Sequence, residues 1–600
     1  MEVVKLINNR VEILKGMDLE NLNDKLGKAI KIYCSEKSDT ITLEKASSLN
    51  NELTKIAITY VAYKIKKSGF NGNYSEFMSK VEVSNKVREI LEYHVEGFWN
   101  LVQEISEEFS LDELISYTIF YDSEGRSHFE RVTDGIISTP ESLIKLSNKL
   151  LDVKSGDNVL DLCSGKGNFL RDTYCSHPDA KYYGVEINYV QAGISLIRME
   201  ALESDSDIYL EDANEFRGDT KYDKVFSNCP FRMKLSNVDT VANRYSEEIG
   251  ITEIELLRAS SDWIFNLSLL DNLKESGKGV AISVMGTLWR PNSPDKKIRK
   301  YFVDNGYIET IINLPASMFN GTGVSTCIIV FSRNNEKVRL IDASDLGEVK
   351  DRIKKVLTED DISNIISMVE NDTKKSKLVD FNEIKNNDYI LDPIKYLDSI
   401  PEFENGIKLG DLSLGISRGD QSSHKDINEL RTTEKTKYRC LELSDIKDGY
   451  VDFKDEYLET IQEEKQKYLA KDKMIVITRV GNPSFRSVII DKKDEEEILV
   501  TGQFILVELD DKKINPAYVQ AFLTSDLGKK CLNRASTGNV LKNISIGELK
   551  KMVIPVPSRE IQDEIANEYL ATVDEVILWQ KKYNDAKEKL HYVYKEEGLV

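Results

Sequence analysis

The fold is decided by the segment Asn158-Val159-Leu160-Asp161-Leu162-Cys163-Ser164-Gly165-Lys166-Gly167-Asn168-Phe169-Leu170. A short apolar strand meets an aspartate, a Gly-x-Gly turn follows, and a helix opens. Gly165 and Gly167 let the backbone approach a ligand where a Cβ atom would clash. Two glycines leave less room for a pyrophosphate than the six-residue dinucleotide pattern does. The segment therefore predicts a βαβ unit that binds a nucleoside carrying an amino acid.

Two further strands end in acidic residues. Residues 182–185 lead into Glu186, about twenty residues after the glycine turn, where a carboxylate is expected to bind ribose hydroxyls. Residues 207–210 lead to Asp212, which we expect near an adenine amino group. Ligands of such sheets lie at the carboxyl ends of the strands, where these residues fall.

A fourth strand is predicted in Asp223-Lys224-Val225-Phe226-Ser227-Asn228-Cys229-Pro230-Phe231. The Asn228 amide oxygen and the carbonyls of the turn can accept hydrogen bonds from an exocyclic amino group. Pro230 stiffens the turn and Phe231 offers a flat face on which a base can stack. Asn and Pro are also ordinary turn residues, and it is the upstream strands that favour a functional site.

A helix start is predicted at residues 138–150, with Ser138 or Thr139 as cap and Pro140 in the first turn. A helix N-terminus can also hold a ligand carboxylate. The local pattern favours simple capping.

Composition predicts a chain of several domains. At 600 residues it should divide into three or four, and its 40% hydrophobic content is ordinary. We find no run of about 20 apolar residues and no signal-peptide pattern at the start. Seven scattered cysteines and five histidines argue for a reducing cytoplasm and against structural zinc or another metal. The net charge of −21 argues against an extensive basic surface for nucleic acid, although the local potential decides binding.

In this order, the motifs resemble those of S-adenosylmethionine-dependent N6-adenine DNA methyltransferases, above all the modification subunits of type I restriction–modification systems. Residues 311–331 carry the Leu-Pro…Phe…Thr-Gly-Val-x-Thr pattern of that family. The resemblance implies a Rossmann-like class I methyltransferase core that uses S-adenosylmethionine. It implies a cofactor site made by Thr139, Asp161, Gly165, Gly167, Glu186, Asp212 and Asn228, and a target-base site made by Asn228, Cys229, Pro230 and Phe231.

Cys229 departs from the family, which usually has a first proline there. A carbonyl survives this substitution, so the turn could work with less rigidity, or it could have lost catalysis.

Residues 405–597 resemble one target-recognition domain of a type I DNA-specificity subunit, followed by its helix. Residues 474–479 and 486–490 are expected to form a hairpin around a turn at 481–483. The candidates for groove or phosphate contacts are Arg418, Lys425, Arg479 and Arg486. For each of them alone, a solvated surface charge is the alternative.

Residues 561–594 predict an amphipathic helix of about 50 Å. Its seam, with Gln580 and Lys587 at two positions, consists of Tyr569, Val573, Val576, Tyr583, Leu590 and Tyr594. Because one small domain does not need so long a helix, we expect it to pack on the methyltransferase core or on a second chain. A homodimer reading a split, near-palindromic site is the expectation, with a monomer reading a short asymmetric site as the alternative.

We therefore expect a multidomain α/β protein with five parts: a helical domain at 1–135, a methyltransferase domain at 136–335, a connector at 336–404, a DNA target-recognition domain at 405–560 and a long helix at 561–600. Helical pieces of the connector are predicted at 348–356 and 360–369. The expected function is site-specific methylation of adenine N6 in duplex DNA, within a restriction–modification or related phage-defence system that could include a separate nuclease subunit. An amide N-methyltransferase and a cofactor-binding DNA-binding protein that does not methylate remain the alternatives.

Overall fold

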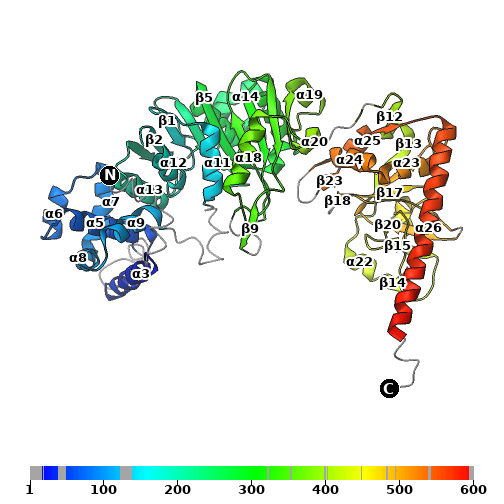
Figure 1. Cartoon of the computed structure of the whole chain (residues 1–600), viewed down its shortest axis with the longest axis horizontal. Coiled ribbons are helices and arrows are strands. Elements are labelled where there is room, and N and C mark those ends of the chain that lie inside the picture. Colours follow the sequence, from blue (N-terminus) through cyan, green and yellow to red (C-terminus); the bar gives the residue numbers. More distant parts are fainter. Residues whose placement is uncertain are drawn as a thin grey trace. The chain divides into compact units, whose positions relative to one another are not determined.

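A computed structural model of the chain describes residues 17, 19–37, 49, 51–121, 138–319, 323–351, 354–397, 401, 403–447, 449–481, 484–493, 495–537 and 542–592. It has two compact units, Met1–Pro393 and Ile394–Val600 (Figure 1). The division into five parts stays a prediction.

The described part of the first 121 residues contains helices joined by short loops, and no strand. They are α3 (Leu19–Glu36), α5 (Glu52–Ser68), α6 (Tyr74–Lys80), α7 (Asn85–Val95), α8 (Trp99–Glu108) and α9 (Leu111–Phe120). Helix α5 is central: it packs against α7, α8 and α9, and against α13 (Tyr189–Ala201) of the following region. Asn51 caps α5 by accepting the Thr54 N–H at 3.0 Å.

These helices also contact the glycine turn. Lys166, which lies between the two glycines, donates to Glu52 of α5 at 2.6 Å, and both side chains are largely buried. Arg198 of α13 donates to the Lys166 carbonyl at 2.9 Å and to the Tyr121 carbonyl at 2.5 Å.

One nine-stranded sheet organises the first unit, in the order β11-β8-β6-β7-β5-β4-β1-β2-β3. Its strands are β1 (Asn158–Asp161), β2 (Lys181–Val185), β3 (Ser206–Tyr209), β4 (Tyr222–Ser227), β5 (Leu273–Val284), β6 (Ile308–Asn313), β7 (Thr326–Phe331), β8 (Lys337–Asp342) and β11 (Ser376–Asp380). Strands β1 to β5 are parallel, and β7 inserts antiparallel between β5 and β6. The order confirms the predicted Rossmann-like class I methyltransferase core.

The sheet reverses its strand order beside β1, which pairs with β2 on one side and with β4 on the other. In open α/β sheets, ligands bind at such a switch point, which here lies at the carboxyl ends of β1 and β4. The helices of this region, besides α13, are α11 (Glu141–Leu151), α12 (Asn168–Ser176), α14 (Asp239–Ile249), α15 (Glu253–Leu256), α16 (Ser261–Asn272), α17 (Ser293–Asp304), α18 (Glu359–Glu370) and α19 (Phe381–Asn386).

The segment expected to be a connector is structured. Strands β8 and β11 lengthen the large sheet, and α18 confirms the helix predicted at 360–369. The helix predicted at 348–356 is wrong, because the residues form an antiparallel pair, β9 (Glu348–Asp351) with β10 (Lys354–Val356). Charged residues flank Val349 on both sides, which suits a strand and supplies no helical apolar stripe.

The second unit contains several small sheets. Their strands are β12 (Gly406–Lys408) with β24 (Val553–Pro555); β13 (Ser413–Arg418), β21 (Phe504–Leu509), β17 (Ile475–Thr478) and β19 (Ser487–Ile489); β14 (Arg431–Thr432), β16 (Tyr457–Leu458), β15 (Tyr438–Leu441) and β20 (Glu497–Val500); and β18 (Val480–Gly481), β23 (Lys542–Ile544) and β22 (Ser536–Thr537). The antiparallel pairing of β17 with β19 confirms the predicted hairpin. Of its turn, residues 482 and 483 lie outside the described residues.

Helices complete the second unit. They are α20 (Ile394–Leu397), α21 (Leu409–Leu412), α22 (His424–Asn428), α23 (Pro516–Thr524), α24 (Asp526–Arg534), α25 (Ile546–Lys551) and α26 (Arg559–Tyr592). Helix α26 confirms the predicted long helix and packs along α23 (Figure 1). Among the described helices, none combines the length and apolarity that crossing a membrane requires.

Candidate active site

The glycine turn after β1 has a backbone that only glycine adopts easily. Gly165 and Gly167 have φ angles of 51° and 76°, in the left-handed region. A Cβ atom on Gly167 would lie 2.5 Å from Ser195 Oγ of α13. The turn therefore presents bare backbone at the end of β1, as the sequence predicts.

Two carboxylates lie beside this turn: Asp161 is buried and Glu186 is half-buried. Glu186, directly after β2, accepts hydrogen bonds from the N–H groups of Gly165 at 2.9 Å and Asn188 at 2.7 Å. Asp161, the last residue of β1, accepts the Cys163 N–H at 3.2 Å. Burial raises the pKa of Asp161 to about 8, with a further contribution from the charge of Glu186. Burial also raises the pKa of Glu186. Donors such as ribose hydroxyls would satisfy acceptors of this kind.

Asn228, directly after β4, has a fixed side chain with one open acceptor. Its Nδ2 donates to Thr139 Oγ1 at 2.7 Å. Its Oδ1 is buried and has no hydrogen-bond partner among the described residues. A buried amide oxygen without a donor is costly, and an exocyclic amino group is a donor of the right kind.

The expectation that Thr139 or Ser138 caps α11 is wrong. The N-cap is Pro140, and no side chain caps the helix. Thr139 faces Asn228 instead, and Ser138 Oγ accepts from Asn168 Nδ2 at 2.9 Å. Both hydroxyls are thus drawn to the carboxyl ends of β1 and β4, away from the first turn of their own helix.

Cys229 is joined to Cys163 by a disulfide, with a Cα–Cα distance of 5.3 Å. The scattered spacing of the cysteines carried no sign of this pairing. Neighbouring strands β1 and β4 bring together two residues that are 66 positions apart. The bond links the loop after β1 to the Asn228–Phe231 turn. Phe231 in the same turn is half-buried and packs edge-on against Phe319, with ring centroids 5.2 Å apart.

Asp212 lies beyond β3, at the same edge of the sheet. Its Oδ1 accepts the Asn214 N–H at 2.8 Å. Asn214 is itself buried and has an Oδ1 atom without a hydrogen-bond partner among the described residues. Sequence reasoning missed Asn214, because an asparagine beside acidic residues reads as an ordinary turn.

Asp262 is a second residue that sequence reasoning missed. It is 5% exposed at the start of α16, and its Oδ1 accepts the Val284 N–H at 2.8 Å. Burial raises its pKa to about 6. The sequence signal that could have found it is an aspartate directly before the apolar stretch Trp263-Ile264-Phe265.

Of the four DNA-contact candidates, the structure brings Arg418 and Arg479 together. Arg418, at the end of β13, donates to the Gly502 carbonyl at 3.1 Å, and Arg479 donates to Asn543 Oδ1 at 3.2 Å. Burial lowers the pKa of Arg479, and the charge of Arg418 lowers it further, so the two cations are near enough to interact electrostatically.

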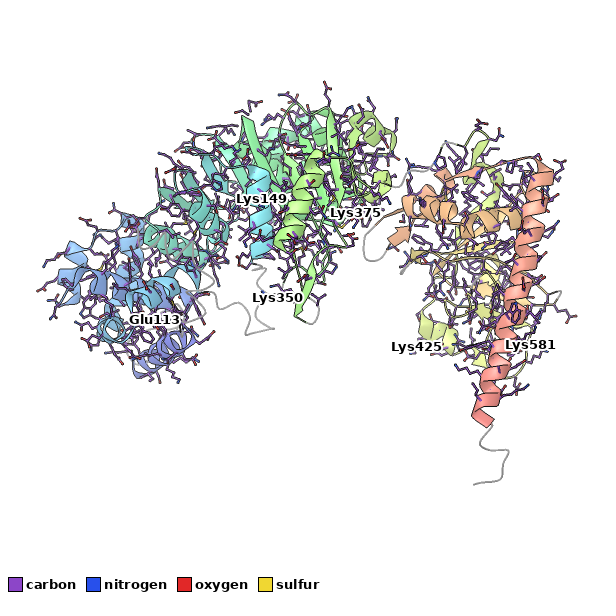
Figure 2. All side chains as sticks on the ribbon, in the orientation of Figure 1. Glu113, Lys149, Lys350, Lys375, Lys425 and Lys581 are labelled. Carbon is purple, nitrogen blue, oxygen red and sulfur yellow. A yellow bond between two sulfur atoms is a disulfide. The ribbon has the colours of Figure 1, made fainter. Side chains whose placement is uncertain are left out.

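Arg486 and Lys425 are placed differently. Arg486 donates from its backbone to Thr478 Oγ1 at 2.9 Å and from its guanidinium to the Ile446 carbonyl at 3.1 Å. Lys425 lies on α22 with 85% of its side chain exposed and Glu429 as its ion-pair partner (Figure 2). Its exposure fits either a phosphate contact or a solvated surface charge, so the candidate stays a prediction.

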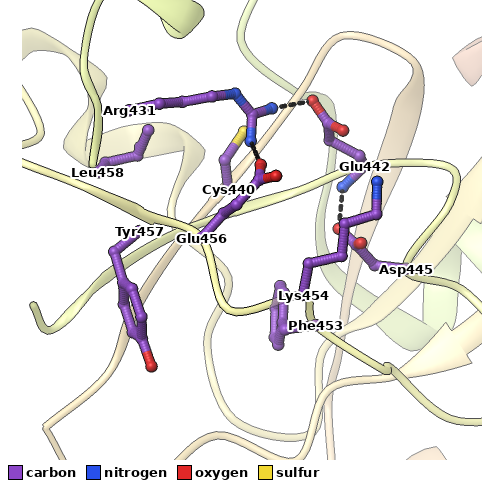
Figure 3. Close-up of a pocket in the computed structure, with 9 residues that line it drawn as sticks. All are labelled: Arg431, Cys440, Glu442, Asp445, Phe453, Lys454, Glu456, Tyr457 and Leu458. Carbon is purple, nitrogen blue, oxygen red and sulfur yellow. Dashed lines mark hydrogen bonds and ion pairs between the residues drawn. The ribbon is translucent and has the colours of Figure 1, made fainter. Parts of the chain in front are cut away.

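A pocket in the second unit offers no phosphate site. Arg431 pairs there with both Glu442 and Glu456 (Figure 3). Asp445 also lines the pocket, so carboxylates outnumber the cations Arg431 and Lys454. Among the described residues, no group of His, Cys, Asp and Glu side chains is arranged to hold a metal ion.

Family models match most of the chain in two parts. Residues 128–405 match the N-6 DNA methylase family, and residues 409–588 match the type I restriction modification DNA specificity domain. The chain joins an N-6 DNA methylase domain to a type I DNA specificity domain. This confirms the resemblance expected from the motifs, and the glycine turn, Glu186 and Asn228 all fall in the methylase domain.

Several curated relatives are methylase subunits of type I restriction enzymes. The chain is 25% identical over 292 residues to the type I restriction enzyme HindI methylase subunit of Haemophilus influenzae, a match covering 45% of this chain and 65% of the relative. It is 26% identical over 433 residues to the type I restriction enzyme MjaVII methylase subunit of Methanocaldococcus jannaschii, covering 66% and 69%. The matches thus span about two thirds of these relatives.

Solved structures resemble parts of the chain at low sequence identity. The methyltransferase subunit of a type I restriction-modification system from Streptococcus thermophilus is 19% identical, with a TM-score of 0.45, covering 66% of this chain and 99% of that one. A modification subunit of a putative type I restriction enzyme from Vibrio vulnificus is 13% identical, with a TM-score of 0.46, covering 60% and 93%.

Proposed function

We propose that the protein transfers a methyl group from S-adenosylmethionine to the N6 amino group of adenine in duplex DNA, at sites chosen by its specificity domain. The two family matches support the reaction class. The glycine turn fits the cofactor, because it presents bare backbone beside two carboxylates, the buried Asp161 and the half-buried Glu186.

The observation that carries the proposal is the Asn228 side chain. Thr139 binds its Nδ2, and the buried Oδ1 at the end of β4 has no hydrogen-bond partner within the part of the chain that the structure describes. An amide held in this way is preorganised for a donor that arrives with the substrate.

Different residues would bind different parts of the cofactor. When bound, S-adenosylmethionine supplies an electrophilic methyl group on its sulfonium. Glu186 would accept hydrogen bonds from the ribose hydroxyls. Asp212 would lie near the adenine amino group of the cofactor, and Thr139 would lie near the carboxylate of the cofactor.

The target adenine has to leave the base stack, since its N6 is not reachable inside a duplex. Asn228 Oδ1 and the Cys229 carbonyl would accept its two N–H groups, which directs the nitrogen lone pair toward the methyl group. Pro230 limits the movement of the turn, and Phe231 supplies a face for the base. The nitrogen loses its proton after alkylation, so positioning and electrostatics provide the catalysis.

The test is incubation with methyl-labelled cofactor and genomic DNA. Wild-type protein should label N6 of adenine, and Asn228→Ala should lower the rate by about two orders of magnitude or more with little change in cofactor affinity. Asn237→Ala, an exposed asparagine nine positions further on, is the control and should methylate normally. Label in protein amides would favour the amide methyltransferase. Cofactor binding without label in any acceptor would favour a DNA-binding protein that does not methylate. Normal activity of Asn228→Ala would remove Asn228 from the site.

We also propose duplex DNA contacts at Arg418, Lys425, Arg479 and Arg486, and assembly as a homodimer through α26. The supporting observation for the dimer is that the second half of α26 carries exposed apolar side chains: Val576, Ile577, Leu578, Trp579, Tyr583 and Leu590. A separate nuclease subunit would be a further partner of such a complex.

A further inference from the structure

The disulfide between Cys163 and Cys229 lies between the two halves of the candidate active site. Cys163 stands two residues beyond the end of β1, within the segment that leads into the glycine turn. Cys229 stands two residues beyond the end of β4, in the Asn228–Phe231 turn. Because β1 and β4 are neighbours at the switch point, a bond between these residues ties the cofactor loop to the turn that would hold the base.

Position 229 is where rigidity matters for the proposed reaction. The Asn228 side chain is anchored by Thr139, but the second acceptor is the backbone carbonyl of Cys229. A proline would restrict φ at this residue, and cysteine does not. The disulfide attaches residue 229 to Cys163, whose own N–H is held by the buried Asp161 at 3.2 Å. The cross-link can therefore replace the stiffness that a proline would give.

We propose that Cys163 and Cys229 are a reversible thiol–disulfide pair that positions the Asn228–Phe231 turn, and that the disulfide form methylates faster than the dithiol form. The proposal rests on the proposed function. It assigns Cys163 a positioning role.

The chemistry balances with a peroxide as oxidant. Two thiols and one hydrogen peroxide give one disulfide and two water molecules, so two electrons pass from sulfur to the peroxide oxygens. A small dithiol reverses the step by attacking one sulfur and then closing its own disulfide, which returns both cysteines to thiols. Cys163 is half-buried while Cys229 is 7% exposed, so Cys163 is the sulfur that such reagents reach first.

The experiment uses the full chain in two states, after treatment with hydrogen peroxide and after treatment with dithiothreitol. Mass spectrometry of non-reduced peptides should show the 163–229 cross-link in the first state and its absence in the second. Reduction should lower kcat for adenine methylation by about tenfold, because a loose turn occupies the productive geometry less often, with little change in KM for the cofactor. An unchanged rate, or a faster rate after reduction, would overturn the proposal.

Three variants separate the pair from other effects. Cys163→Ser should have the rate of the reduced protein in both states. Cys229→Pro should give equal rates in both states, because its ring restrains the turn without a partner. Cys175→Ser, a half-buried cysteine outside the disulfide, should keep the wild-type response. A wild-type response in Cys163→Ser would overturn the assignment. If no state methylates DNA while the cross-link forms and breaks, the proposed function fails and the redox chemistry of the pair stands.

Discussion

At the scale of single residues, the candidate site consists of polar side chains that are held by hydrogen bonds to the protein and can still accept further ones from a ligand. Glu186 binds two backbone N–H groups and Asn228 binds one hydroxyl, and each keeps acceptor capacity at the carboxyl ends of the strands. Sequence reasoning found these residues because each follows directly on an apolar strand. It missed Asp262, whose position is fixed by a hydrogen bond from the Val284 N–H in a strand distant in sequence.

Glu186→Ala is expected to weaken cofactor binding. Two ribose hydroxyls would lose a charged acceptor worth roughly 1.5–3 kcal/mol. Titration calorimetry measures the change directly. Glu309→Ala, which removes a part-buried carboxylate paired with Lys278 at 2.8 Å, is the control. Unchanged affinity in Glu186→Ala would exclude Glu186 from the cofactor site.

The raised pKa of Asp161 leads us to expect that the stability of the folded protein depends on pH. The folded protein retains this proton up to a pKa of about 8, whereas the unfolded chain releases it near the ordinary value of 3.8. Unfolding therefore becomes more favourable as pH rises from about 4 to about 8, and the effect is complete above that range. Asp161→Asn, without cofactor, should gain Tm relative to wild type as pH rises from 5 to 8. Scanning calorimetry with parallel curves for the two proteins would contradict this.

At the scale of elements, the strands that end in a polar residue suited to ligand binding could be predicted from the sequence. Pairings between segments distant in sequence could not. The motifs located β1 to β4, since each apolar run stops at a polar residue of defined chemistry. The β9–β10 pair and the 163–229 disulfide depend on which segments become neighbours, and local periodicity does not record that.

The exposed apolar side chains of helix α26 lead us to expect a dimer. Its first half packs on α23, while Val576, Tyr583 and Leu590 of the expected seam are exposed. Tyr594, the last seam residue, lies outside the described residues. The double variant Val576→Glu and Tyr583→Glu should convert a dimer into a monomer, because it buries like charges across a two-fold axis. Light scattering with and without DNA is the measurement. Lys581→Glu, which adds negative charge on another face of the helix, should remain dimeric. A wild-type monomer at micromolar concentration on DNA would refute the dimer.

At the scale of the whole molecule, the two family matches meet between residues 405 and 409, close to the boundary of the two compact units at 393 and 394. Each unit has its own core. This division supports separate tasks, with modification in the first unit and choice of DNA sequence in the second.

A chimera is expected to change the methylated sites. Replacing residues 405–600 with the corresponding region of another specificity domain should move methylation to new sequences while cofactor affinity stays the same. Single-molecule sequencing of the modified DNA reads the sites. If the original sites remain modified, the second unit does not choose the sequence.

The ion pair between Lys166 and Glu52 has a consequence for how the methylase region can be cut from the chain. The glycine turn is supported from outside its own sheet: Glu52 accepts from Lys166 at 2.6 Å, and Arg198 spans from the Lys166 carbonyl to Tyr121. A chain of residues 136–393 alone would lack two of these acceptors, Glu52 and the Tyr121 carbonyl. We therefore expect that fragment to bind S-adenosylmethionine more weakly than residues 1–393, which titration calorimetry of the two fragments would measure.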